Sequence, residues 1–191
     1  MLGIPTAPTI DVIRFHPIRE NEVWVGGMWF DGVELWHSVD LGENWTDRHE
    51  ILDTLLVKQY GEDIFFPQSL HEIAFDPAEA NAIYLGSEWL WNSKNCATTW
   101  TVLLDTLGAY RTVSVNPSNS KEIYISAGRH FFKTIDKGDN WESILLPMSK
   151  SVMAFIEVDW QNRILYTHFF SQELSREVLG VYKRLFDGGS G

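Results

Sequence analysis

Four stretches of the chain repeat one pattern, and this repetition constrains the fold more than any other feature. The stretches begin at Ile13, Ile73, Val113 and Phe155. Each has an alternating apolar segment, a turn and a second alternating segment, and a proline stands in the first three turns, at Pro17, Pro77 and Pro117. Period-two alternation between turn residues is typical of β-strands. The sequence therefore predicts an all-β repeat protein.

A second motif follows each pair of predicted strands at a regular offset. It reads SVDLGENW from Ser38, SKNCATTW from Ser93 and TIDKGDNW from Thr134, and a partial copy begins near Asp187. An Asp or Asn in a tight turn accepts backbone N–H groups, and a Gly two positions later supplies a positive φ. The Trp is expected to pack against the neighbouring repeat. The expected structural residues are Ser38, Asp40, Gly42, Trp45, Ser93, Asn95, Trp100, Thr134, Asp136, Gly138, Trp141 and Asp187.

The S/T-x-D-x-G-x-x-W pattern resembles the Asp-box of the BNR-repeat β-propellers. That superfamily includes sialidases, xyloglucanases, sortilin-like receptors and photosystem II assembly factors. The resemblance covers nearly the whole chain and implies a β-propeller of four-stranded antiparallel blades, a single segment over residues 1–191. The blades fall at about 10–48, 70–104, 110–145 and 152–191, the last incomplete.

The number of blades leaves the closure of the ring open. Closed propellers of this family usually have more than four blades, so we expect either part of a longer chain or a homo-oligomer that completes the ring. A half-blade leaves an unpaired strand edge, and such edges recruit partners. A four-bladed ring, closed by the N-terminal residues acting as the missing outer strand, is the alternative.

The loops that carry function are expected at the end of the blades opposite to the Asp-box turns. In one interpretation the aromatic residues there stack on a sugar or a peptide and the acidic residues accept hydrogen bonds; in the other, the aromatics are wedges between blades. Loops on a rigid scaffold are where binding usually occurs. The candidate ligand-binding residues are Trp29, Phe30, Asp63, Glu88 and Trp89, with Asp31 as a further acceptor.

The resemblance also offers two catalytic templates. Sialidases need an arginine triad, and this chain has too few arginines on the expected loops, so we reject that activity. Xyloglucanases place a catalytic Asp next to a Gly in the first blade, where this chain has Asp31 and Gly32. Their second carboxylate lies in a later blade, and a glycosidase needs both carboxyls across one cleft. A fragment of such a glycoside hydrolase, inactive alone, is the alternative function.

Charge and composition exclude several other classes. Fifteen Lys and Arg against 26 Asp and Glu give a net charge of −11, which argues against nucleic acid and anionic membrane surfaces. No apolar run reaches the roughly 18 residues that a membrane span needs. One cysteine and six histidines without ligand spacing predict no metal, and no cofactor is expected. We expect a non-catalytic recognition or scaffold propeller for a carbohydrate or protein ligand, extracellular or periplasmic like most of the family.

Overall fold

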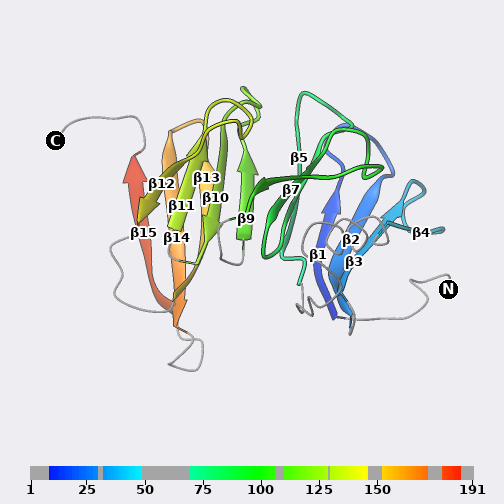
Figure 1. The fold of residues 1–191 in the computed structure, drawn as a ribbon, viewed down its shortest axis with the longest axis horizontal. Coiled ribbons are helices and arrows are strands. Elements are labelled where there is room, and N and C mark those ends of the chain that lie inside the picture. Colours follow the sequence, from blue (N-terminus) through cyan, green and yellow to red (C-terminus); the bar gives the residue numbers. More distant parts are fainter. Residues whose placement is uncertain are drawn as a thin grey trace.

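The computed structural model describes residues 9–29, 32–48, 69–105, 110–128, 130–145, 152–171 and 178–185. Every regular element in these ranges is a β-strand, and the strands form four antiparallel sheets that follow one another in chain order (Figure 1). Across the same ranges, no helix has the length and apolar character needed to cross a membrane. The all-β class expected from the alternating pattern is confirmed.

We call the four sheets blades 1 to 4. Blade 1 contains β1 (Thr9–Phe15), β2 (Val23–Trp29), β3 (Gly32–Ser38) and β4 (Thr46–Asp47). Blade 2 contains β5 (Glu72–Phe75), β6 (Ile83–Gly86), β7 (Leu90–Ser93) and β8 (Thr101–Leu104). Blade 3 contains β9 (Tyr110–Val115), β10 (Ile123–Ala127), β11 (His130–Thr134) and β12 (Glu142–Leu145). Blade 4 contains β13 (Val152–Asp159), β14 (Ile164–Ser171) and β15 (Val178–Leu185). Each strand pairs with its neighbour in sequence, as in a meander.

The first and third turns of a blade lie side by side at one end of it. In each of blades 1 to 3, a backbone N–H in the third turn donates to a carbonyl in the first. The bonds run from Leu41 to Asn21 (3.0 Å), from Cys96 to Asn81 (2.9 Å) and from Lys137 to Lys121 (3.0 Å). We call this end the turn face, and the opposite end, with the β2–β3 and β6–β7 connections, the loop face.

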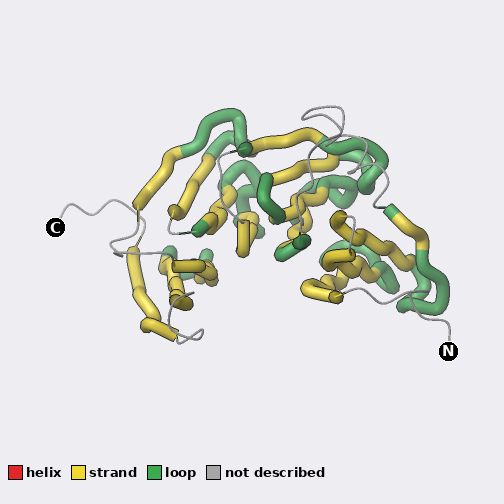
Figure 2. The backbone as a smooth tube through the Cα atoms, turned by 60° about the horizontal axis from the view of Figure 1, so that its bottom comes forward, coloured by secondary structure: helices red, strands yellow, loops and turns green. Residues whose placement is uncertain are grey.

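The blades follow one another along an arc (Figure 2). Their first strands, β1, β5, β9 and β13, contact one another from blade to blade, and we call them the inner strands. Blade 1 and blade 4 lie at opposite ends of the molecule (Figure 1). The described residues therefore form an arc rather than a closed four-bladed ring.

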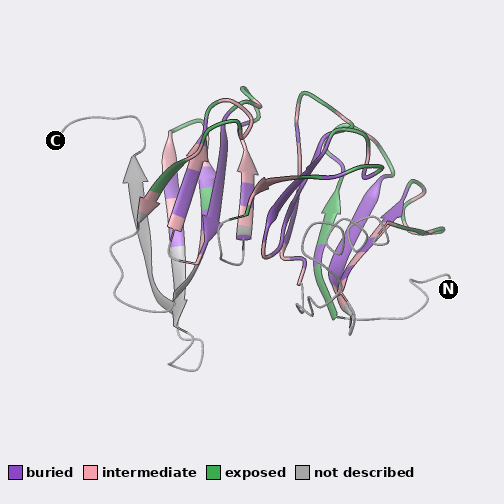
Figure 3. Ribbon diagram, viewed as in Figure 1, coloured by how far each residue is buried: buried purple, intermediate pink, exposed green. Residues whose placement is uncertain are grey.

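The core lies between the blades rather than within any one of them. Trp24 and Leu35 of blade 1 pack with Leu85, Trp91 and Trp100 of blade 2, and all five are buried. Similar clusters join blade 2 to blade 3 and blade 3 to blade 4. Figure 3 shows the middle strands buried and β1 mostly exposed. A fully buried aliphatic or aromatic side chain contributes about 1.5–3 kcal/mol, so packing between blades holds the arc together.

Candidate functional site

The residues expected on the loop face are only partly described. Phe30, Asp31 and Asp63 lie outside the described residues. The backbone of Trp29 ends β2, opposite Gly32, and its side chain is not described. A ligand-binding role for Trp29, Phe30 and Asp63, and a catalytic role for Asp31, therefore stay predictions.

Trp89 lies in the core rather than on an open surface. Its side chain is 8% exposed and packs edge-on against Trp91, with the ring centroids 6.1 Å apart. It belongs to the cluster between blades 1 and 2, together with Val33 and Leu70. A stacking platform needs an open ring face, so this burial favours the wedge interpretation of Trp89. Glu88 precedes it in the β6–β7 connection and is partly buried.

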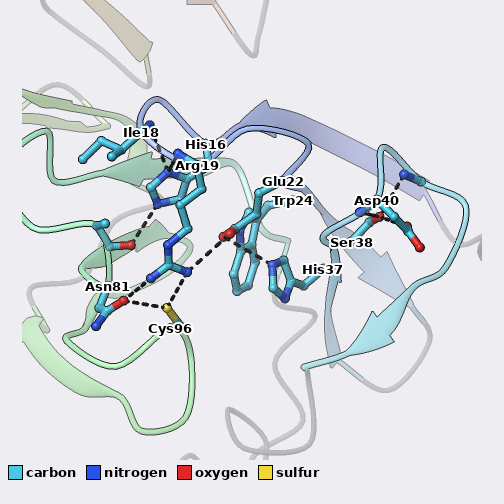
Figure 4. A network of polar contacts seen from close by, with 12 residues as sticks. His16, Ile18, Arg19, Glu22, Trp24, His37, Ser38, Asp40, Asn81 and Cys96 are labelled. Atoms are coloured by element: carbon cyan, nitrogen blue, oxygen red, sulfur yellow. Dashed lines mark hydrogen bonds and ion pairs between the residues drawn. The ribbon is translucent and has the colours of Figure 1, made fainter.

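The turn that begins at Ser38 is closed by its own side chains (Figure 4). The hydroxyl of Ser38 donates to Asp40 at 2.8 Å and accepts the backbone N–H of Gly42 at 2.8 Å. Asp40 in turn accepts the backbone N–H of Asn44 at 2.8 Å. Hydrogen bonds from Asn44 and Ser38 lower the pKa of Asp40, so its carboxylate is committed to the turn.

The turns of blades 2 and 3 have the same bonding pattern. Thr134 accepts the N–H of Gly138 at 3.0 Å and donates to Asp136, while Ser93 accepts the N–H of Ala97 at 2.9 Å. Hydrogen bonds from Thr134 and Asn140 hold the pKa of Asp136 at about 2. The corresponding residue in blade 2, Asn95, accepts the N–H of Thr99 at 2.9 Å. Asp187 lies outside the described residues.

The three turn tryptophans differ in burial. Trp100 is buried in the cluster between blades 1 and 2, and Trp141 packs against the cluster between blades 2 and 3. Trp45 and Trp141 are both only partly buried, so among these three only Trp100 is fully buried as expected. Trp100 and Trp141 pack toward the blade before their own, whereas no described blade precedes blade 1.

A hollow of about 320 Å³ lies where the inner strands of all four blades meet, and we call it the inner-strand pocket. Each inner strand contributes at least one polar or charged side chain to its lining. Its lining includes Arg14, Phe15, Glu72, Thr112, Ser114 and Glu157. Charged groups from separate blades therefore meet in one place.

The charged centre of this pocket is the pair of Arg14 and Glu72. A guanidinium nitrogen of Arg14 lies 2.6 Å from a carboxylate oxygen of Glu72, and the arginine remains 45% exposed. Burial raises the pKa of Glu72 to about 7, because the opposing effect of Arg14 is smaller and the charge of Glu157 adds to the rise. Near neutral pH the Glu72 carboxyl therefore exists in both protonation states.

The two hydroxyl groups of the pocket tie blade 4 to blade 3. Thr112 accepts the backbone N–H of Ile156 at 3.3 Å, and Ser114 accepts the indole N–H of Trp160 at 3.1 Å. Within the described ranges, no three His, Cys, Asp or Glu side chains are grouped so that they could hold a metal ion. The pocket offers a guanidinium, a titrating carboxyl, an exposed carboxylate and an exposed aromatic ring, which suits binding of a polar or cationic group.

Sequence reasoning missed this pocket. Arg14 and Glu72 belong to separate blades, and no local spacing relates them. The available signal was a charged residue inside an apolar strand, since Arg14 stands between Ile13 and Phe15 where the pattern places a side chain against the next blade.

No family model matches the chain, and no curated protein matches it in sequence. Solved structures do resemble it. The GH74 xyloglucanase from Xanthomonas campestris has a TM-score of 0.69 and 14% identity over 92% of this chain and 29% of that chain. YCF48 bound to a D1 peptide has a TM-score of 0.55 and 14% identity over 86% and 51%. An auxiliary nutrient binding protein from Bacteroides thetaiotaomicron has 0.58 and 10% over 91% and 41%.

The chain thus spans between about a third and a half of the length of these structures. The matched proteins include a glycoside hydrolase, a protein with a bound peptide and a nutrient binding protein, so the likeness does not select one function. At such low identity it establishes architecture alone. Together with the four meander sheets joined by buried interfaces, it shows that this chain has a β-propeller fold, with the sheets as its blades.

Proposed function

We propose that the protein is a recognition module that binds a protein ligand at the inner-strand pocket, rather than an enzyme. The observation that carries this proposal is the convergence of four blades on one polar hollow around Arg14 and Glu72. A site assembled from rigid strands is already formed before the ligand arrives, which lowers the entropic cost of binding.

The chemistry of the pocket favours a ligand that presents a basic side chain. Glu157 is exposed, and Glu72 is partly ionised near neutral pH, whereas Arg14 is the one cation of the three. Phe15 adds an aromatic ring that is 68% exposed. A Lys or Arg of a peptide can pair with the exposed carboxylate of Glu157 and stack on the ring face of Phe15. The net charge of −11 also attracts a basic partner.

Two of the similar structures support recognition as a role for this architecture. One is described with a bound D1 peptide, and the other as a nutrient binding protein. The D1 peptide and the nutrient are ligands of those two proteins, and they are not assigned to this chain.

The Asp-box assignment is part of the same proposal. It is supported by the shared hydrogen bonds of the Ser38, Ser93 and Thr134 turns. A second contact surface on the loop face, around Phe30 and Asp63, and an extracellular or periplasmic location rest on the sequence resemblance alone.

Selection from a random peptide display library on the immobilised protein tests this function. We expect enrichment of peptides with Lys or Arg, and binding about tenfold weaker or worse to Glu157→Gln. Glu43→Gln removes one exposed carboxylate from the turn face and serves as the matched control, with unchanged binding expected. Recovery of no peptide, or of peptides that bind Glu157→Gln as tightly as the original protein, would contradict the proposal.

A glycoside hydrolase of the xyloglucanase type is the second candidate function. It is favoured by the carboxyl of Glu72, whose pKa of about 7 suits a general acid, in a pocket that also contains Glu157. Titration with xyloglucan oligosaccharides separates the two candidates, because a fragment that is inactive alone would still bind its substrate. Xyloglucan binding that is lost in Glu72→Gln or Asp31→Asn supports the glycoside hydrolase, and binding of basic peptides without binding of xyloglucan supports the recognition module.

A further inference from the structure

Blades 1 and 3 each keep a buried glutamate beside the start of their second strand. In blade 1, Glu22 accepts the indole N–H of Trp24 at 2.8 Å (Figure 4). In blade 3, Glu122 accepts the hydroxyl of Tyr124 at 2.8 Å. The aromatic group and the glutamate lie two residues apart in both blades, so the repeat supplies each buried polar ring with an acceptor of its own.

Blade 2 keeps the aromatic residue and lacks the acceptor. Its two residues at these positions are Ala82 and Tyr84. Tyr84 is 2% exposed, and Ala82 stands at the position from which Glu22 and Glu122 accept their hydrogen bonds. Across the sheet, Asn92 pairs with Tyr84, where blade 1 has the larger ring of His37 stacked on its partner at 4.1 Å. Two smaller side chains therefore leave space around the tyrosine hydroxyl.

A pocket of about 400 Å³ occupies this place, on the turn face between blades 2 and 3. Ala82, Tyr84 and Asn92 line it from blade 2, and Leu103 and Ile135 add apolar walls. The amide nitrogen of Asn92 donates to two backbone carbonyls, so the side-chain oxygen is left as an acceptor. The volume falls within the range of small-molecule sites, roughly 300–1,000 Å³.

The charges around this pocket balance. Three lysines and three acidic residues line it: Lys94, Lys121, Lys137, Glu79, Asp136 and Asp139. Lys137 is already paired with Glu79, and Asp136 is committed to its own turn. Burial raises the pKa of Tyr84, and nearby carboxylates raise it further, so the hydroxyl stays a donor. An anionic or cationic ligand gains little here, whereas a neutral polar ligand meets both donors and acceptors.

We propose that this pocket binds a neutral saccharide, with one sugar oxygen accepting the hydrogen bond of Tyr84 where blades 1 and 3 use a glutamate. Sugar hydroxyls both donate and accept, which matches the Asn92 oxygen and the tyrosine hydroxyl. Ile135, which is 66% exposed, offers an apolar surface to the C–H face of the ring. The site lies on the turn face, apart from the inner-strand pocket, and takes another class of ligand.

Titration with glucose, galactose, mannose and xylose, followed by saturation-transfer NMR, tests the proposal. We expect saturable binding of at least one of these sugars. Tyr84→Phe should weaken it about tenfold, since a lost hydrogen bond to a sugar hydroxyl leaves the ligand group unpaired. Ala82→Glu introduces the acceptor that blades 1 and 3 use and fills the pocket, so it should abolish binding while the thermal midpoint stays equal or rises.

Tyr124→Phe is the matched control, because it removes the equivalent hydroxyl where Glu122 is the acceptor. It should lower stability and leave sugar binding unchanged. Three outcomes would overturn the proposal. They are no saturable binding of any of the four sugars, binding to the Tyr84→Phe and Ala82→Glu variants as tight as to the original protein, or tighter binding of glucuronate than of glucose. None of them bears on peptide binding at the inner-strand pocket, so the two proposals fail separately.

Discussion

Arg163 of blade 4 places both terminal nitrogens of its guanidinium 2.9 Å from the two carboxylate oxygens of Glu122 in blade 3. Glu122 also accepts from Asn116 at 2.8 Å. Burial disfavours the ionised form, but these hydrogen bonds outweigh it, so the pKa of Glu122 lies below its usual value. The contact is a bidentate link across the interface between two blades.

Removal of the Glu122 charge should therefore weaken the interface between blades 3 and 4. Glu122→Gln leaves the arginine without its carboxylate and should lower the free energy of unfolding by about 2–3 kcal/mol. The folded pKa is lowered, so the stabilisation is present above the unfolded value of 4.5 and is lost as the pH falls through the folded pKa. Urea unfolding at neutral and acidic pH measures both effects. Exposed Glu142→Gln is the control, and equal stabilities at neutral pH would contradict the assignment.

Glu72 should give the opposite dependence on pH. Its folded pKa is about 7 against 4.5 for the free side chain, so its contribution to stability is complete below about pH 4.5 and is lost as the pH rises through 7. Glu72→Gln cannot ionise and should be more stable than the original protein at pH 8, by up to about 3 kcal/mol. Thermal melts of both proteins from pH 5 to pH 8 measure the difference, which should vanish toward pH 5. A constant difference would show that Glu72 does not titrate in this range.

The fold was predictable because its determinants are local. Alternating residues such as Val23 and Val25, with proline after the preceding strand, indicate strands from the chain alone, and the strand class and blade architecture are confirmed. The inner-strand pocket was not predictable, since the contact of Arg14 with Glu72 depends on how two blades pack. Trp89 was only partly predictable. The sequence shows an aromatic residue at this position, but a wedge between blades and a stacking platform for a ligand both use such a residue.

The pocket beside Tyr84 has a signal in the sequence that can be interpreted only with the structure. Alignment of the repeats places Ala82 where the first and third copies have glutamate. An alanine directly before a strand does not by itself indicate a pocket. It becomes informative only when the hydrogen bonds of Glu22 and Glu122 show what that position supplies.

Gly138 should tolerate a side chain less well than Gly128. Both have positive φ, 98° and 57°, which disfavours any residue with a Cβ. A Cβ at Gly138 would also lie 3.2 Å from Leu103 and 3.3 Å from Trp141, whereas one at Gly128 meets nothing within 4 Å. We expect Gly138→Ala to cost about 2 kcal/mol and Gly128→Ala about 1 kcal/mol. Chemical unfolding of the two variants measures this, and a larger loss for Gly128→Ala would contradict the assigned packing.

The exposed face of blade 1 should bind another blade. Ile13 is 53% exposed, whereas its equivalents Ile73 and Val113 are 1% and 5% exposed because the preceding blade covers them. Apolar surface of this kind drives association, and a two-fold dimer would cover it with closed symmetry.

We therefore predict that light scattering gives roughly twice the monomer mass, as a symmetric dimer requires. Ile13→Glu should dissociate the dimer, since the interface would have to bury a charge without a partner. Val39→Glu places the same charge on an apolar residue of the β3–β4 turn that is 65% exposed, and it should leave the mass unchanged. A monomer at high protein concentration, or equal masses for the two variants, would show that a second copy does not cover this face.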